Sequence, residues 1–232
     1  MQYKFGAMSD VGKVRSNNED SYKIGQSYAI VADGMGGHKK GEVASKMAVD
    51  IISDFVTEKK CGPVQAIEAA NKEIYKKSSK AEFAGMGTTT VMCIIEEDKA
   101  LIANVGDSRG YLFRKGELKQ ITKDHSLVQK LIDDGEITEE EAEMRADKSV
   151  ILRAVGADRD IKVDVFENDI SEGDIILLCS DGLTNCVEKE EITKTLTRDI
   201  SIQKKAEELV KNANKNGGFD NITAVLLEFR KV

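Results

Sequence analysis

Three aspartates stand beside apolar, strand-like segments and could bind divalent cations. Asp33 and Asp181 each close an apolar run and are followed by glycine, whereas Asp220 comes just before the last apolar run. Hard cations such as Mg2+ prefer oxygen ligands from carboxylates, carbonyls and water. Like charges gathered at strand ends repel one another unless cations lie between them. The pattern therefore indicates a divalent-cation site, although any one Asp-Gly pair could instead be a turn in which the aspartate bonds its own backbone.

Other polar residues close to these aspartates could assist such a site. Carboxylates could add ligands, arginine suits phosphate, and a histidine could donate a proton, although a surface loop histidine is by default inert. These candidates are Arg15, Glu19, Asp20, His38, Asp124 and His125. The turn 106–109 instead predicts an internal ion pair between Asp107 and Arg109, so we interpret Asp107 as structural and prefer Asp124 as the ligand.

The elements that must position these residues follow from the hydrophobic periodicity. Residues 26–32 predict a strand that ends at a glycine-rich turn. Residues 41–58 predict a helix with one buried stripe, and a second helix is expected from Pro63 to Ser79. The stripe of the first helix is Val43, Met47, Ile51 and Phe55.

The rest of the chain changes from strands back to helices. From Thr88 onward, runs rich in β-branched residues predict several strands, with a hairpin turn at Lys115-Gly116. Residues 126–146 have moderate helical character, and residues 202–213 carry apolar residues at the spacing of an amphipathic helix. Helices before and after a central group of strands predict an α+β fold in which helices cover a sheet or a pair of sheets.

Composition limits the possible partners and the domain count. The 232 residues include 41 acidic and 34 basic side chains, for a net charge of -7. This balance argues against nucleic acid, whose phosphates require clustered Lys and Arg. A single proline and the lack of low-complexity segments predict one domain over residues 1–232. The four cysteines lack CxxC spacing and no run approaches ~20 apolar residues, so we expect reduced thiols, no membrane segment and a cytoplasmic location.

Taken together, eight motifs resemble the type 2C (PPM) protein phosphatases, especially the compact bacterial ones. They occur in the family's order and span nearly the whole chain: RSNNED, VADGMGGH, GTTTV, NVGDSRGYL, TKDHS, LRAVG, LLCSDGL and FDNITAVLL. The resemblance implies a four-layer αββα sandwich, with two central antiparallel sheets flanked by helices. It also implies hydrolysis of phosphoserine and phosphothreonine in proteins by a water that two or three Mn2+ or Mg2+ ions activate.

The resemblance also assigns roles to residues. Asp33 would bridge two metals, Gly34 would offer its carbonyl to one, and Asp181 with Asp220 would complete the other. Three further assignments are less central. Glu19 and Asp20 would hold metal-bound waters, Arg15 would bind phosphate, and Asp124 with Asp181 would form a weaker third site. The expected partners are phosphorylated proteins, among them a Ser/Thr kinase and its targets, and the expected state is a monomer.

Two positions depart from the family pattern. Met35 stands where many eukaryotic members have histidine, so a metal-bound water or His38 would protonate the leaving serine oxygen. Arg145-Ala146 stands where the family often has His-Pro, inside a segment at about 131–149 that corresponds to a mobile flap. Two alternatives remain open: a hydrolase of nucleotides or small phosphoesters, and a catalytically silent module that binds phosphoproteins.

Overall fold

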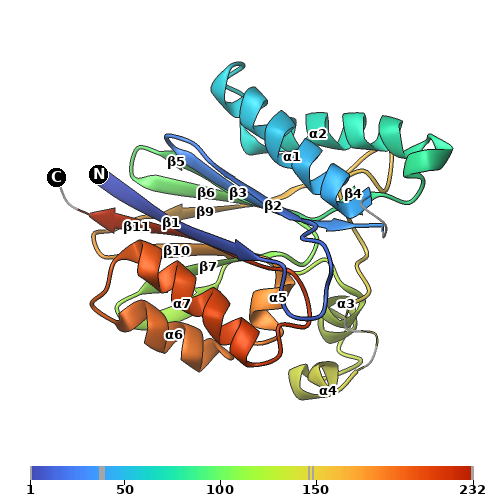
Figure 1. Cartoon of the computed structure of the whole chain (residues 1–232). Helices are drawn as coiled ribbons and strands as arrows, with labels where there is room; N and C mark the ends of the chain where they lie inside the picture. Colours follow the sequence, from blue (N-terminus) through green and yellow to red (C-terminus); the bar gives the residue numbers. More distant parts are fainter. Residues whose placement is uncertain (1, 37–39, 146, 148, 231–232) are drawn as a thin grey trace.

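Two antiparallel β-sheets lie face to face at the centre of the molecule, and helices cover the outer side of each (Figure 1). The computed structural model describes residues 2–36, 40–145, 147 and 149–230. This arrangement confirms the predicted α+β class and the four-layer αββα sandwich.

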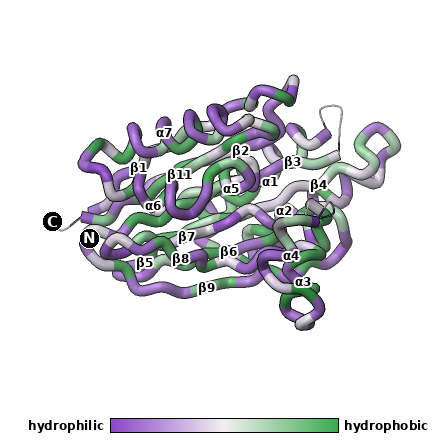
Figure 2. The backbone as a smooth tube through the Cα atoms, turned by 90° about the horizontal axis from the view of Figure 1, so that it is seen from below, coloured by the Kyte–Doolittle hydropathy of each residue, from purple (hydrophilic) through white to green (hydrophobic). Residues whose placement is uncertain are grey.

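The first sheet joins the two ends of the described chain. Its strand order is β1-β11-β10-β7-β8, and every pairing is antiparallel. The strands are β1 (Gln2–Asp10), β7 (Arg109–Arg114), β8 (Glu117–Gln120), β10 (Ile175–Cys179) and β11 (Ile222–Arg230). The helices of its outer side are α5 (Asp181–Thr184), α6 (Lys189–Thr197) and α7 (Ile202–Lys215). The alternation of hydrophilic and hydrophobic residues along α7 can be followed in Figure 2, and it confirms the predicted amphipathic helix.

The second sheet has the order β2-β3-β5-β6-β9, with the short β4 paired to β3. The strands are β2 (Asp20–Ile24), β3 (Tyr28–Met35), β4 (Gly87–Thr88), β5 (Thr90–Glu96), β6 (Lys99–Val105) and β9 (Asp164–Asp169). Its outer side carries α1 (Lys40–Thr57), α2 (Pro63–Ser78) and the short 3-10 helix η1 (Ala81–Phe83).

The buried stripe predicted for α1 is only half right. The fully buried stripe consists of small residues and one isoleucine: Ala44, Ala48 and Ile52. The predicted stripe of Val43, Met47, Ile51 and Phe55 is partly buried beside it. Small side chains face the sheet because they let α1 approach β3 closely, whereas the larger ones fill the flank of the same core.

Three apolar cores separate the four layers. One lies between the first sheet and α5–α7, one between the second sheet and α1–α2, and one between the sheets. Along β10, Ile176 and Leu178 face the second sheet, while Leu177 and Cys179 face the helices. Because side chains alternate along a strand, a strand buried on both faces needs an unbroken apolar run. This is why the strands that lead to the acidic motifs are continuously apolar.

Two short helices extend from the end of the sandwich that carries α5. They are α3 (Leu127–Asp133) and α4 (Glu139–Glu143), and we call residues 127–149 the flap segment. Its base is closed by backbone hydrogen bonds from Leu127 N to Val150 O (2.9 Å) and from Leu152 N to His125 O (2.7 Å). The predicted flap at about 131–149 lies within this segment, its role as a mobile flap stays a prediction, and Ala146 lies outside the described residues.

The predicted hairpin turn between β7 and β8 is confirmed. Lys115 and Gly116 have φ values of 52° and 86°, the left-handed conformation that a two-residue hairpin requires at both central positions. Across the described ranges, no helix has both the length and the apolar character needed to cross a membrane.

Candidate active site

Four aspartates from distant parts of the chain lie at one end of the two sheets. Asp20 begins β2 and pairs across the strands with Asp33 of β3. Asp181 begins α5 two residues after the end of β10, and its negative charge contributes to the raised pKa of Asp33. Asp220 lies just before β11. The fold thus brings the strand-end aspartates to the same end of the sheets, and their role as metal ligands stays a prediction.

Threonines hold the end of β3 in place. The Thr88 hydroxyl and the Thr89 N–H both donate to the carbonyl oxygen of Asp33, each at 2.8 Å. The Asp33 N–H donates to the Thr89 hydroxyl at 3.0 Å. That hydroxyl also contacts the Ser108 hydroxyl at 2.6 Å, so β3 is joined to the turn between β6 and β7. The motifs GTTTV and GDSR therefore connect two acidic segments.

Gly34 is required by close packing and not by a turn. The sequence predicted that the strand ends before this glycine, but β3 continues through it because Gly34 pairs with Thr88 of β4. A β-carbon at Gly34 would lie 2.1 Å from the carbonyl oxygen of Gly41 and 2.7 Å from that of Glu19. Only glycine lets α1 and the Glu19 backbone approach β3 this closely.

Asn221 fixes the loop that carries Arg15 and Glu19. Its side-chain oxygen accepts from the Glu19 N–H at 2.7 Å, and its amide donates to Val11 O (3.0 Å) and Asn17 O (2.8 Å). Arg15 donates to Asp220 at 2.8 Å, and 53% of its side chain remains exposed. The loop thereby presents an accessible guanidinium beside Asp20, Asp33, Asp181 and Asp220, which we call the acidic cluster.

Burial and mutual repulsion raise the pKa of the clustered carboxyl groups. Desolvation is the largest cause at each position, and neighbouring negative charges add to it. The pKa of Asp20 is raised to about 7, and the pKa values of Asp33 and Asp181 are also raised. Desolvation likewise raises the pKa of Glu19. Positive charge placed among these groups would keep them ionised.

One buried oxygen of this cluster lacks a hydrogen-bond partner among the residues that the structure describes. Asp20 is 8% exposed, and its Oδ2 accepts from the hydroxyls of Ser180 (2.7 Å) and Thr223 (2.6 Å). Its Oδ1 is buried and receives no hydrogen bond. A buried carboxylate oxygen without a donor is costly unless a cation or a water bound to one satisfies it. Together with the all-oxygen donor set, this fits Mn2+ or Mg2+.

The carboxylates are near one another but do not form a finished coordination shell. Among the residues that the structure describes, no three His, Cys, Asp or Glu side chains are grouped tightly enough to hold a metal ion. One reason is that Arg15 engages Asp220. Enclosing a cation therefore requires these side chains to move closer together.

Asp124 forms a hydrogen-bonded ion pair with Arg109. Arg109 donates to Asp124 Oδ2 from Nε at 2.9 Å and from Nη2 at 2.7 Å, and Gln120 donates to Oδ1 at 3.0 Å. The predicted ion pair between Asp107 and Arg109 is wrong, because Arg109 points across the β7–β8 hairpin to Asp124. Both carboxylate oxygens of Asp124 already have donors.

Asp107, which we interpreted as structural from the sequence, lies beside Asp181 and so extends the acidic cluster. It is 7% exposed, and desolvation followed by the charges of Asp181 and Asp124 raises its pKa to about 7. Its position follows from strand pairing, since Arg109 of β7 lies opposite Cys179 of β10, two residues before Asp181. No local pattern in the sequence carries this information.

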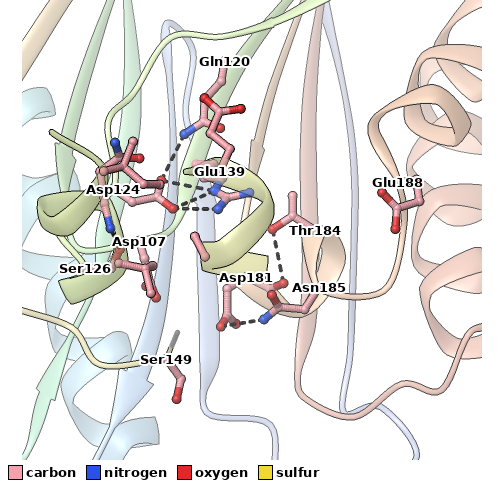
Figure 3. A pocket seen from close by; sticks show the side chains of 15 residues that line it. Asp107, Gln120, Asp124, Ser126, Glu139, Ser149, Asp181, Thr184, Asn185 and Glu188 are labelled. Atoms are coloured by element: carbon pink, nitrogen blue, oxygen red, sulfur yellow. Dashed lines mark hydrogen bonds and ion pairs between the residues drawn. The ribbon is translucent and has the colours of Figure 1, made fainter. Parts of the chain in front are cut away.

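A pocket of about 530 Å3 opens between the acidic cluster and the flap segment. Figure 3 shows Asp107, Asp124 and Asp181 around it, with Glu139 of α4 near Asp124 in this view and Glu188 at the far right. His38, a predicted proton donor, lies outside the described residues. Met35 is half-buried at the end of β3.

An αββα sandwich with a carboxylate-lined cleft at its sheet ends is the arrangement expected of a metal-dependent phosphohydrolase. A family model for protein phosphatase 2C matches residues 13–226, and the chain belongs to this family.

Similar proteins cover nearly all of the chain. It is 42% identical to the serine/threonine phosphatase stp of Listeria monocytogenes serotype 4b, over 95% of this chain and 93% of that protein. It is 38% identical to protein phosphatase PhpP of Streptococcus pneumoniae, over 97% of this chain and 96% of that protein.

Solved structures agree with the fold. The Mycobacterium tuberculosis serine/threonine phosphatase PstP/Ppp superposes with a TM-score of 0.93 at 36% identity, covering 99% of each chain. The PstP catalytic domain in complex with two manganese ions gives a TM-score of 0.89 at 36% identity, again covering 99% of each chain. The resemblance inferred from the sequence motifs is confirmed.

Proposed function

We propose that Asp33, the Gly34 carbonyl, Asp181 and Asp220 hold two divalent cations with which this chain hydrolyses phosphoserine and phosphothreonine in proteins. The chain is a metal-dependent protein serine/threonine phosphatase by family, and the proposal concerns which of its residues do the work. The observation that carries it is the convergence of desolvated, mutually repelling carboxylates at the ends of β2, β3 and β10, where one buried oxygen of Asp20 has no hydrogen-bond donor among the described residues.

The cofactor is Mn2+ or Mg2+. Bound divalent cations lower the pKa of a water molecule and polarise a phosphoryl group. Glu19 and Asp20 would hold waters around the cations, a role supported by the raised pKa of both groups and the free oxygen of Asp20.

Arg15 would bind the substrate phosphate. Its guanidinium uses one nitrogen for Asp220 and keeps half of its surface exposed, so its remaining N–H groups are available. The planar fork of arginine matches two phosphate oxygens and would orient the phosphoryl group toward the cations.

For the weaker third metal, Asp107 with Asp181 is a better candidate pair than Asp124 with Asp181. Asp107 is buried next to Asp181 without an ion-pair partner of its own among the described residues, whereas Arg109 and Gln120 hold both oxygens of Asp124. Asp124 could bind a cation only after Arg109 releases it. A water or His38 as the proton donor stays a prediction.

The substrates are phosphoproteins. A Ser/Thr kinase and its targets, a monomeric state, a cytoplasmic location and a single catalytic domain over residues 1–232 are further parts of the proposal. Support for the substrate class comes from relatives named serine/threonine phosphatases.

A direct test compares Asp33→Ala with Asp50→Ala, an aspartate of α1 whose partner is Lys23. With a phosphothreonine peptide and Mn2+, Asp33→Ala should lose at least 100-fold in kcat (about 2.7 kcal/mol), and Asp50→Ala should keep wild-type kcat. EDTA should abolish phosphate release. Full activity in EDTA, or in Asp33→Ala, would contradict the proposed ligand set.

A further inference from the structure

His125 forms two hydrogen bonds with Gly106, the residue that precedes Asp107 in the β6–β7 turn. Its backbone N–H donates to the carbonyl oxygen of Gly106 at 2.9 Å, and its ring Nδ1 accepts from the Gly106 N–H at 3.0 Å. One residue thus satisfies both backbone polar groups of Gly106. Gly106 has a φ of +103°, a conformation that glycine adopts readily and other residues rarely do, so the two hydrogen bonds of His125 act on a turn built around glycine.

The hydrogen bonds of His125 define its tautomer. Nδ1 accepts a hydrogen bond and therefore carries no proton, so Nε2 carries the ring hydrogen and donates to Asp164 Oδ2 at 3.1 Å. Asp164 begins β9, opposite Asn104 of β6. The ring therefore braces the β6–β7 turn against the edge strand of the second sheet, in an orientation that only this tautomer allows.

The same ring is connected to the base of the flap segment. The Leu152 N–H donates to the carbonyl oxygen of His125, and Arg153 Nη1 lies 2.9 Å from Nε2 and 3.4 Å from Nδ1. Because Nε2 already carries a hydrogen, the acceptors of Arg153 Nη1 are Lys162 O (3.2 Å) and Asp164 Oδ1 (3.3 Å). His125 is 9% exposed, and its contacts face the turn, β9 and the flap base.

We propose that His125 is a positioning residue that sets the Asp107 carboxylate for the most weakly bound cation. His125 Nδ1 accepts from the Gly106 N–H and so holds the Gly106 backbone in place. The Gly106 backbone in turn sets the direction of the Asp107 backbone that follows it. Asp164 fixes the ring, and Arg153 ties that anchor to the base of the flap segment. This inference rests on the proposed role of Asp107 as a ligand.

Two substitutions separate positioning from general packing. In His125→Asn, the side-chain oxygen stands near the place of Nδ1 and can still accept from Gly106. In His125→Gln, the amide reaches the place of Nε2 near Asp164 and leaves the Gly106 N–H without its acceptor. Both replace the ring by a smaller polar group, so a merely structural role would make the two variants alike.

The readout is Mn2+ binding by calorimetry to chelator-treated, folded protein, with thermal unfolding in EDTA as the stability measure. We expect His125→Gln to weaken the weakest Mn2+ about tenfold and His125→Asn to stay within about twofold of the unsubstituted protein, since indirect partners of metal ligands typically contribute 10–100-fold. The tighter ions should be unaffected. Asn71→Ala is the matched control, because Asn71 accepts from the N–H of Gly156, a glycine outside the acidic cluster that also has a positive φ.

Asp107→Ala, measured in the same titration, separates this inference from the function it rests on. If Asp107→Ala leaves every Mn2+ affinity unchanged, the ligand role of Asp107 and the inference are both overturned. If Asp107→Ala removes the weakest ion while His125→Asn and His125→Gln bind alike, only the positioning role is overturned. Should His125→Gln not fold, Asp164→Ala replaces it, and an unchanged weakest affinity there would equally overturn the inference.

Discussion

The acidic side chains of the cleft oppose one another in the metal-free protein. Desolvation first, and neighbouring charge second, raise the pKa values of Asp20 and Asp107 to about 7, against 3.8 for an ordinary aspartate. Between these two values the folded chain binds more protons than the unfolded chain, so the free energy of unfolding falls as the pH rises. Each group's stabilising proton is fully present below its unfolded pKa and is lost as the pH passes its folded pKa.

In EDTA, the thermal midpoint should therefore fall by a few degrees between about pH 6.5 and about pH 7.5. Carboxylates with lowered pKa values, such as Asp50 and Asp164, are ionised in both states across this window and cancel. Scanning calorimetry at constant ionic strength measures the midpoint. A midpoint that rises with pH would contradict the shifts assigned to Asp20 and Asp107.

Asp20→Asn should stabilise the metal-free protein and impair catalysis. The substitution removes a desolvated charge while an amide oxygen can still accept from Ser180 and Thr223. We expect a higher urea midpoint in EDTA and a lower kcat with Mn2+. The matched control is Asp50→Asn. Asp50 forms a partly exposed ion pair with Lys23, which lowers the Asp50 pKa against the effect of desolvation. Loss of this ion pair should reduce the free energy of unfolding by less than about 1 kcal/mol.

At the scale of elements, the contact between β3 and α1 sets the geometry around Asp33. Gly34→Ala would push a methyl group against the backbones of Gly41 and Glu19, and β3 cannot yield without moving Asp33 and Gly34, two proposed metal ligands. We expect a loss of about 1–3 kcal/mol in urea unfolding, together with weaker Mn2+ binding. The control is Gly62→Ala at the start of α2, where φ is -66° and only the flexible Gln65 side chain is near. Equal stability of the two variants would refute the close-packing role.

Element pairing also explains what the sequence could and could not predict. Asp33 and Asp181 were found because each follows a run that is apolar on both faces, a local pattern. The partnership of Arg109 with Asp124, and the place of Asp107, depend on the register between β7 and β10 and on the β7–β8 hairpin. Such registers join residues far apart in the chain, so local spacing suggested the wrong ion pair. Roles that came from the family motifs remain predictions where no contact tests them.

At the scale of the whole molecule, the net charge of -7 and the carboxylate cluster make cation binding and folding interdependent. Saturating Mn2+, at about 100 times its Kd, should add about 2.7 kcal/mol and raise the thermal midpoint by about 5–10 °C. Asp33→Ala should lose most of this shift, whereas Asp50→Asn should retain it. A thermal shift assay with and without Mn2+ measures it, and an undiminished shift in Asp33→Ala would contradict the linkage.

The pairing of β1 with β11 has a consequence for biosynthesis. These strands are hydrogen-bonded neighbours from Gln2–Arg230 to Asp10–Ile222, and β11 also separates β1 from β10. Until β11 leaves the ribosome, β1 has no partner in its sheet, the core between the sheets lacks Val225, Leu227 and Phe229, and Asp220 is missing from the cleft. Contacts this distant in sequence also slow folding. We therefore expect phosphatase activity to begin only after β11 has been made, and a nascent chain stalled before β11 should be inactive.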